Sequence, residues 1–154
     1  LHTAETFPGV EHRIELVRTL NGVRYYNDSI ASSPTRTIAG LHSFHQKVIL
    51  IAGGYDKKIP FEVLGKEVQD HVKTLVLTGH TAEKIQKAVV ESEGYQAGHP
   101  AILMEPDFKQ AVLKASQAAE EGDVVILSPA CASFDHFKNF AQRGQTFKAI
   151  VNEL

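Results

Sequence analysis

The chain has 154 residues, which suit one domain with a sizeable core and are too few for two ordinary domains. A formal net charge of −2 gives no electrostatic reason to expect nucleic acid or an acidic membrane surface as a partner. The single cysteine excludes an internal disulfide and suits a reducing compartment, and no apolar run approaches transmembrane length.

A polar segment ending in proline and glycine opens the chain, and residues 1–10 are predicted to be an inter-domain linker. Because this start is unlike a natural beginning, the chain is expected to be cut from a longer protein, with one domain over residues 11–154. Residues 11–18 alternate between apolar and polar side chains, as a strand does. Asn21-Gly22 is a strong hairpin signal, so residues 23–26 are predicted to return as a second strand.

Beyond the hairpin, short apolar runs alternate with segments of helical periodicity, which is the pattern of βαβ units. The predicted strands cover residues 48–52, 74–77, 101–104 and 124–127. The predicted helices cover residues 35–45, 60–71, 81–91, 106–120 and 140–152. The expected fold class is α/β: a three-layer, Rossmann-like domain with a mostly parallel six-stranded sheet and one antiparallel edge strand.

The stretch from Asp123 to Gly144 carries the most information. Its apolar run ends at Pro129, which cannot donate a backbone hydrogen bond, and four small residues ending at Ser133 follow. Ser133 is predicted to cap a helix that starts near Phe134. Such a loop presents amides and a hydroxyl to a carboxylate or phosphate, although composition alone favours an ordinary strand-to-helix turn.

Ligands of doubly wound sheets bind beyond the carboxyl ends of the strands. Four loops rich in small or hydrogen-bonding residues leave those ends, over residues 27–33, 53–58, 78–81 and 128–133. Lys57, Ser32 and Ser133 together would suit a small anion, because an ammonium group and hydroxyls can share one carboxylate. Each residue alone also has an ordinary explanation, since loop lysines are usually solvated and loop serines are commonly caps.

Several familiar motifs are absent from the sequence. There is no phosphate-binding Gly-x-x-x-x-Gly-Lys-Ser/Thr loop, no Gly-x-Gly-x-x-Gly after the first strand and no Gly-x-Ser-x-Gly. The eight histidines are scattered without a metal-ligand spacing such as His-x-x-x-His, so no metal site is predicted. Cys131 is expected to be buried filler rather than a nucleophile.

Four segments together resemble the Mur ligases. They contain His12-Arg13, Asn27-Asp28-Ser29, Gly53-Gly54-x-Asp56-Lys57 and the run from Ser128 to Gly144. The resemblance covers the chain from Glu11 onward, and within the family it is to enzymes that add D-glutamate to UDP-N-acetylmuramoyl-L-alanine in peptidoglycan synthesis.

The resemblance implies the C-terminal, glutamate-binding domain of a monomeric, cytoplasmic, three-domain enzyme. In this family ATP phosphorylates the acceptor carboxylate, and the amino group of D-glutamate attacks the resulting acyl phosphate. ATP and magnesium would be held mainly by a central domain, and the uridine nucleotide by a first domain. This chain lacks the phosphate loop of that central domain, so it is expected to be inactive alone. Neither nucleic acid nor a membrane is an expected partner.

Matching positions imply which residues bind each substrate, and they imply no catalytic residue and no metal ligand in this chain. D-Glutamate contacts fall on Ser32, Lys57, Ser133, Phe134 and Phe140, and ATP contacts on Arg13 and Asp28. Two positions depart from the pattern of many relatives: Ile30 replaces a lysine and Ser32 replaces a threonine. Ile30 therefore removes a cation near the nucleotide and glutamate, whereas Ser32 keeps the hydroxyl.

Two alternatives stay open. One is the C-terminal domain of another amide ligase of the same superfamily, such as a folylpolyglutamate synthase. The other is a non-enzymatic module that binds a nucleotide or another anion. A phosphate loop upstream of Leu1 would separate the ligases from the binding module.

Overall fold

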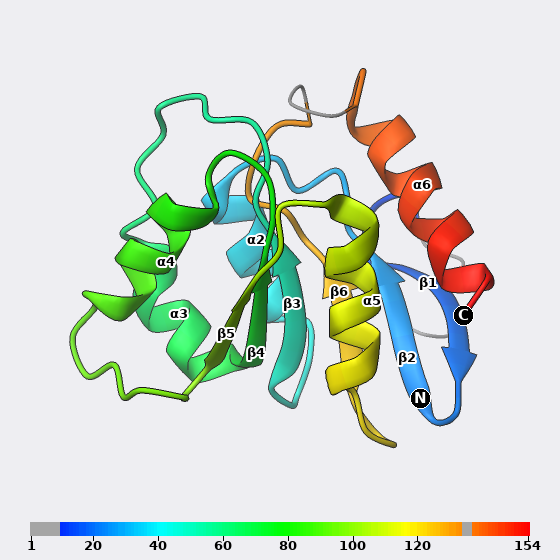
Figure 1. The fold of residues 1–154 in the computed structure, drawn as a ribbon, viewed down its shortest axis with the longest axis horizontal. Coiled ribbons are helices and arrows are strands. Elements are labelled where there is room, and N and C mark those ends of the chain that lie inside the picture. Colours follow the sequence, from blue (N-terminus) through cyan, green and yellow to red (C-terminus); the bar gives the residue numbers. More distant parts are fainter. Residues whose placement is uncertain (1–9, 134–136) are drawn as a thin grey trace.

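A single sheet with the strand order β1-β2-β6-β3-β4-β5 forms the centre of the computed structural model, which describes residues 10–133 and 137–154 (Figure 1). The strands are β1 (Glu15–Leu20), β2 (Val23–Asn27), β3 (Val48–Ala52), β4 (Val72–Leu77), β5 (Ala101–Met104) and β6 (Val124–Leu127). The helices are α2 (Pro34–Leu41), α3 (Leu64–His71), α4 (Ala82–Val90), α5 (Phe108–Ala118) and α6 (Phe140–Asn152). Phe134 and the predicted linker, apart from Val10, lie outside the described residues.

The antiparallel edge strand is β1, which pairs with β2 through a two-residue turn. Asn21 and Gly22 form this turn with φ of 53° and 79°, the left-handed conformation that a tight hairpin requires. The other five strands, in the order β2, β6, β3, β4 and β5, are all parallel to one another. The predicted mixed sheet, with one antiparallel edge strand, is confirmed.

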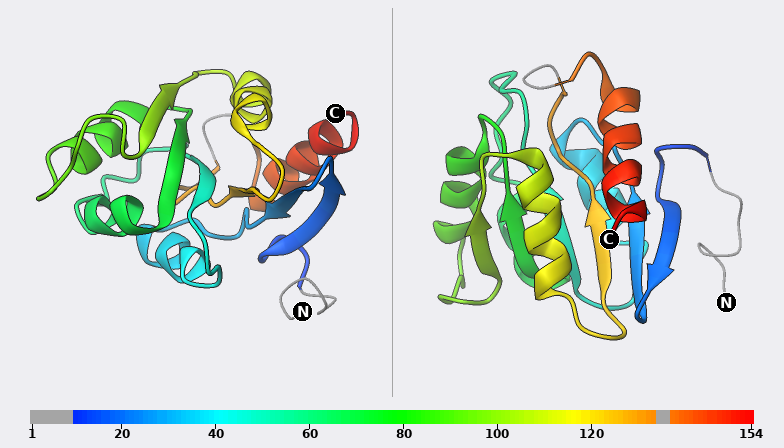
Figure 2. Two further views of the ribbon diagram at one scale, coloured as in Figure 1. Left: turned by 90° about the horizontal axis from the view of Figure 1, so that it is seen from below. Right: turned by 45° about the vertical axis from the view of Figure 1, so that its right-hand side comes forward.

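Helices cover both faces of the sheet, which gives the predicted three layers (Figure 2). One face packs against α2, α3 and α4, and the other packs against α5 and α6. The alternation of side chains along a strand separates the two cores. In β3, for example, Leu50 packs into the first core and Ile51 into the second.

One strand and two helices begin or end about four residues from the predicted position. β1 begins at Glu15 rather than at residue 11, because His12 and Ile14 adopt positive φ of 69° and 46°. α2 ends at Leu41, since Phe44 turns back to pack on Tyr26 with ring centroids 4.9 Å apart. α3 begins only at Leu64, after a turn in the predicted helix 60–71.

The predicted helix start near Phe134 lies outside the described residues, and the last helix that the structure describes is capped by a residue other than Ser133. α6 begins at Phe140, and its N-cap is Asn139, whose side chain accepts a hydrogen bond from the Gln142 amide at 2.9 Å. Residues 137–139 are not helical, so Ser133 does not cap this helix. In the part of the chain that the structure describes, every helix is too short or too polar to span a membrane.

Candidate functional site at the carboxyl edge of the sheet

Strand β6 lies between β2 and β3, so these three parallel strands end at one edge of the sheet. The loops that follow them are joined by backbone hydrogen bonds. These run from Ala130 N to Ala31 O (3.0 Å), from Gly53 N to Pro129 O (2.9 Å) and from Tyr55 N to Ala132 O (2.9 Å). The predicted ligand-binding loops 27–33, 53–58 and 128–133 are therefore held side by side.

The loop after β4 joins the same group through Thr81. The Thr81 amide donates to the Gly54 carbonyl at 3.2 Å, and the Gly54 amide donates to the Thr81 hydroxyl at 3.0 Å. That hydroxyl also lies 3.2 Å from Cys131 Sγ. Cys131 is 2% exposed, which confirms its prediction as a buried residue.

Gly53 and Gly54 permit this close approach of the loops. Gly53 has φ of 118°, and a Cβ atom there would overlap the Thr78 carbonyl group. A Cβ atom on Gly54 would lie 2.6 Å from Ala132 O. The two glycines of the Gly53-Gly54 motif are thus explained by packing of backbone against backbone.

Arg143 ties α6 to two of these loops. Arg143 is 2% exposed. Its Nε donates a hydrogen bond to Ser29 Oγ at 3.0 Å, and its Nη2 donates one to Ser29 O at 2.8 Å. Nη1 donates to Cys131 O at 2.9 Å, and Nη2 lies 3.5 Å from Ser32 Oγ. Arg143 belongs to the quoted motif, but this fastening role was not among the sequence predictions.

The structure places four of the five residues implied for D-glutamate along this edge, and Phe134 lies outside the described residues. Ser32 is half-buried beside Arg143. Ser133 is buried, next to the bond that joins Ala132 to Tyr55. Phe140 opens α6, where its backbone carbonyl accepts a hydrogen bond from Ser29 Oγ at 2.7 Å.

Lys57 lies in the exposed part of the loop after β3. It follows Tyr55 by two residues, and Tyr55 forms an isolated bridge with Ala132. Lys57 and Ser133 therefore belong to loops that are joined on the same side of the molecule.

The two residues implied for ATP, Arg13 and Asp28, line one cavity of about 180 Å³. Ile30, Arg36 and Gly40 are also part of its wall. Gly40 belongs to α2, and a Cβ atom on it would lie 2.7 Å from Asp28 Oδ2. The cavity combines a carboxylate with two guanidinium groups, a set that can bind both hydroxyls and phosphates.

The carboxyl group of Asp28 is buried and hydrogen-bonded. Its Oδ1 accepts from the Ile14 amide at 3.1 Å, and its Oδ2 accepts from Ser128 Oγ at 2.8 Å. Burial raises the pKa of Asp28 to about 6, while these two hydrogen bonds and the charges of Arg13 and Arg36 act in the opposite direction. Asp28 is therefore ionised at neutral pH but close to its titration range.

His12 connects the first strand pair to α6. The Asn27 amide nitrogen lies 2.9 Å from His12 Nδ1 and donates to Glu15 Oε1 at 3.0 Å. A Cβ atom on Gly144 would overlap the His12 ring, and that ring meets the Phe140 ring edge-on at 5.9 Å between centroids. The glycine after Arg143 thus lets α6 approach the strands closely.

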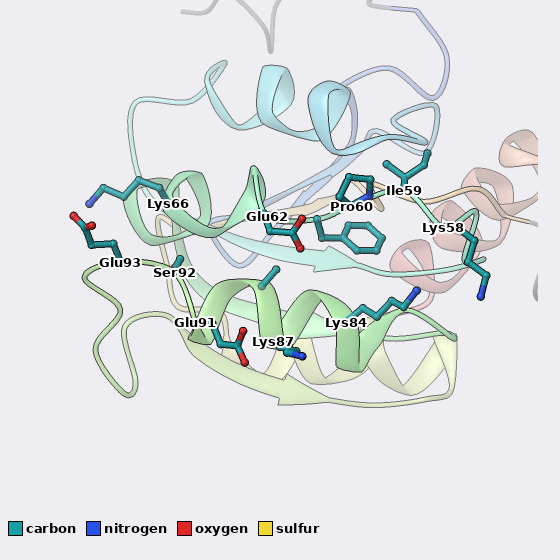
Figure 3. Close-up of a pocket in the computed structure, with 12 residues that line it drawn as sticks. Lys58, Ile59, Pro60, Glu62, Lys66, Lys84, Lys87, Glu91, Ser92 and Glu93 are labelled. Carbon is teal, nitrogen blue, oxygen red and sulfur yellow. The ribbon is translucent and has the colours of Figure 1, made fainter.

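A larger cavity of about 720 Å³ lies between α3, α4 and the loop before α3 (Figure 3). Its wall includes Lys58 but not Lys57, and it carries charges of both signs. Figure 3 shows Lys58 and Lys84 at one end of it, where Lys84 pairs with Asp56 at 2.6 Å. None of the residues implied for D-glutamate or ATP lines this cavity.

Comparison with known protein families gives one match that covers most of the chain. The family described as "Mur ligase, glutamate ligase domain" matches residues 12–131. The chain is 60% identical over 154 residues to UDP-N-acetylmuramoylalanine–D-glutamate ligase of Acetivibrio thermocellus, covering 98% of the chain and 33% of that protein. Identity to the protein of the same name in Clostridium novyi is 58% over 151 residues, with the same coverage. The chain spans about a third of the length of these curated relatives.

Solved structures with the same fold are more distant in sequence. A bifunctional folylpolyglutamate synthase/dihydrofolate synthase from Yersinia pestis superposes with a TM-score of 0.61 at 16% identity, covering 93% of this chain and 32% of that one. A murein peptide ligase from Psychrobacter arcticus gives 0.59 at 16% identity, covering 93% and 31%. At this identity the likeness concerns the fold alone.

Proposed function

The chain belongs to the Mur ligase family, as a glutamate ligase domain, and we propose that it is the C-terminal domain of an ATP-dependent ligase that joins D-glutamate to UDP-N-acetylmuramoyl-L-alanine. Relatives with that name support the reaction. The location of the site is supported mainly by Arg143, which contacts both Ser32 and Cys131. These contacts hold the loops after β2 and β6 together at the proposed site. The whole enzyme would act in the cytoplasm, in peptidoglycan synthesis, as a monomer.

D-Glutamate would bind at the edge where the loops after β2, β3 and β6 meet. Lys57 would balance the charge of one glutamate carboxylate, and the hydroxyls of Ser32 and Ser133 would hydrogen-bond it. Phe134 and Phe140 would close the pocket and exclude water, which strengthens the few polar contacts. Arg143 would act by positioning the loops, since its donors are used by Ser29 and Cys131.

ATP, with magnesium, would be held mainly by a central domain and would supply the phosphoryl group that activates the acceptor carboxylate. The residues of this chain fit the part of the nucleotide that reaches them. Asp28 offers acceptor oxygens to a ribose hydroxyl, and Arg13 can stack on the base or meet the phosphates. Arg36 lines the same cavity as Ile30, so it supplies a cation where Ile30 replaces the lysine of many relatives. Closure of this domain would then complete the site.

The test of Lys57 uses the full-length enzyme from which the domain derives. Lys57→Ala should raise the KM for D-glutamate at least tenfold, because a carboxylate loses its cation. Lys58→Ala is the matched control, since Lys58 is the adjacent residue and its side chain lies in the other cavity, 82% exposed. A KM that is unchanged in Lys57→Ala would remove Lys57 from the site.

A second measurement addresses Ser133. Ser133→Ala should weaken D-glutamate binding by roughly 1–3 kcal/mol, the loss expected when a polar ligand group is left without its partner. Calorimetry on the full-length enzyme would measure it, with Ser116→Ala on α5 as a control away from the site. Equal affinity in Ser133→Ala and the unmodified enzyme would limit Ser133 to a structural role.

A related amide ligase remains the second candidate, because folylpolyglutamate synthase has the same fold. The amino acid that the full-length enzyme consumes separates the two: D-glutamate for the proposed ligase and a different amino acid for the alternative. A non-enzymatic binding module would consume neither, and its gene would lack an upstream phosphate loop.

A further inference from the structure

Two histidines and a glutamate from two helices converge on the surface opposite the proposed site. His42 follows the last residue of α2, and Glu67 and His71 lie one turn apart on α3. His42 Nε2 is 2.7 Å and His71 Nε2 is 3.6 Å from the same atom, Glu67 Oε1. We propose that His42, Glu67 and His71 form a site for a divalent transition-metal ion of the zinc class, which clips α2 to α3.

The fold itself produces this convergence. Glu67 and His71 are four residues apart, so α3 presents both side chains on one face. Leu41 and Leu64 are buried in the same core, which holds the end of α2 against α3. The two imidazole rings lie 4.6 Å apart between centroids, tilted by 33°. His71 immediately precedes β4, so the cluster lies at the amino edge of the parallel strands, away from the carboxyl edge described above.

The distances are close to those of a metal site. Potential ligand atoms of the three residues all lie within 4.8 Å of one another. In a tetrahedral zinc site with bonds of about 2.0–2.1 Å, ligand atoms are separated by roughly 3.3 Å. Side-chain shifts of about 1 Å would therefore bring all three atoms to bonding distance.

The donor set selects the kind of metal. Two imidazoles and a carboxylate suit Zn²⁺, Ni²⁺ or Cu²⁺, whereas Mg²⁺ prefers an all-oxygen set. The side chains of His42, Glu67 and His71 are 55%, 32% and 29% exposed, so an ion can enter from solvent and keep a water as its fourth ligand. The alternative is that Glu67 merely accepts a hydrogen bond from His42, and binding measurements separate the two.

Calorimetric titration of the chain with Zn²⁺, after treatment with a chelator, tests the proposal. We expect one equivalent of Zn²⁺ to bind, with Mg²⁺ giving no heat under the same conditions. His42→Gln, Glu67→Gln and His71→Gln should each weaken Zn²⁺ binding at least tenfold. His45→Gln is the matched control. His45 is also an exposed histidine, three residues from His42, but it does not belong to the cluster.

Absorption by bound Co²⁺ and thermal unfolding give independent measurements. Co²⁺ should develop visible d–d bands with the chain and not with Glu67→Gln, and Zn²⁺ should raise the Tm of the chain but not of that variant. Because His42 is exposed, His42→Gln should keep its fold, which circular dichroism would verify. Absence of Zn²⁺ binding, or equal binding by the chain and His42→Gln, would overturn the proposal.

Discussion

At the scale of single residues, the carboxyl group of Asp28 is buried, and this burial raises its pKa to about 6. The same group titrates near 3.8 without this burial, so the folded state binds its proton more tightly than the unfolded state does. The contribution of Asp28 to the free energy of unfolding is therefore most favourable below pH 3.8, where the carboxyl group is protonated in both states. This contribution is lost as the pH rises through 6, because the folded state then contains a buried charge. A shift of about two pKa units corresponds to a cost on the order of 3 kcal/mol at neutral pH. Such a cost is consistent with the proposed role of Asp28 in binding ATP.

Asp28→Asn should therefore stabilise the chain at pH 7.5 by about 1–3 kcal/mol, because an amide can bond to Ile14 N and Ser128 Oγ without a buried charge. The gain should shrink at pH 4.5, where Asp28 is protonated in the folded state. Urea unfolding at the two pH values measures the difference. Asp123→Asn serves as a control of opposite sign, since Asp123 pairs with Lys73 at 3.1 Å. A gain that is equal at both pH values would contradict the assigned cause.

Some residues at the carboxyl edge of the sheet could be predicted from the sequence, whereas the contacts of Arg143 and the histidine cluster could not. Ser32, Lys57 and Asp28 follow strands, so the doubly wound pattern brings them to one edge. Arg143 donates to backbone carbonyls that are 12 and 114 residues away in the chain, and no local pattern predicts such partners. The histidine cluster escaped because its helical pair is Glu67 with His71 rather than two histidines.

At the scale of elements, α6 is attached to the rest of the domain partly through Arg143, whose guanidinium group bonds to the loops after β2 and β6. Arg143→Lys should lose at least about 2 kcal/mol, since an ammonium group cannot reach both Ser29 and Cys131 at once. Urea unfolding measures this loss. Arg18→Lys is the matched control, because Arg18 makes a bond to Val151 O at 3.1 Å that a lysine can keep. Equal losses in the two variants would show that Arg143 does not fasten α6.

The boundaries of elements were predictable where local and global preferences agree. β3, β5 and β6 match their predicted ranges, because short apolar runs between turn residues have few other ways to be buried. The ends of α2 and α3 were less predictable, since tertiary contacts such as Phe44 with Tyr26 decide where each helix stops. Asn139 rather than Ser133 caps α6, because this helix begins only at Phe140.

At the scale of the whole molecule, one sheet separates two cores, and neighbouring residues of β3 contribute to each. Leu50→Ala and Ile51→Ala should each cost about 2–5 kcal/mol, since both side chains are fully buried. The two cores share every strand of the parallel sheet, so unfolding should stay a single transition in both variants. Urea unfolding followed by circular dichroism and tyrosine fluorescence tests this, with exposed Val63→Ala as the control. Midpoints that differ between the two signals would mean that the cores unfold separately.

The layered architecture follows from the alternation of strands and helices, but the order of strands does not. No local pattern states that β6 lies between β2 and β3. The segments at Asn27, Gly53 and Ser128, which carry part of the family resemblance, end or follow these three neighbouring strands.

The position of β6 also governs when the domain can fold during synthesis. Because the last strand made fills the gap between β2 and β3, a nascent chain that stops before Val124 leaves both of those strands with open edges. Open edges readily pair with other chains, so the incomplete domain is the aggregation-prone stage of translation. Truncation just upstream of β6 is therefore expected to leave a chain that cannot complete its sheet.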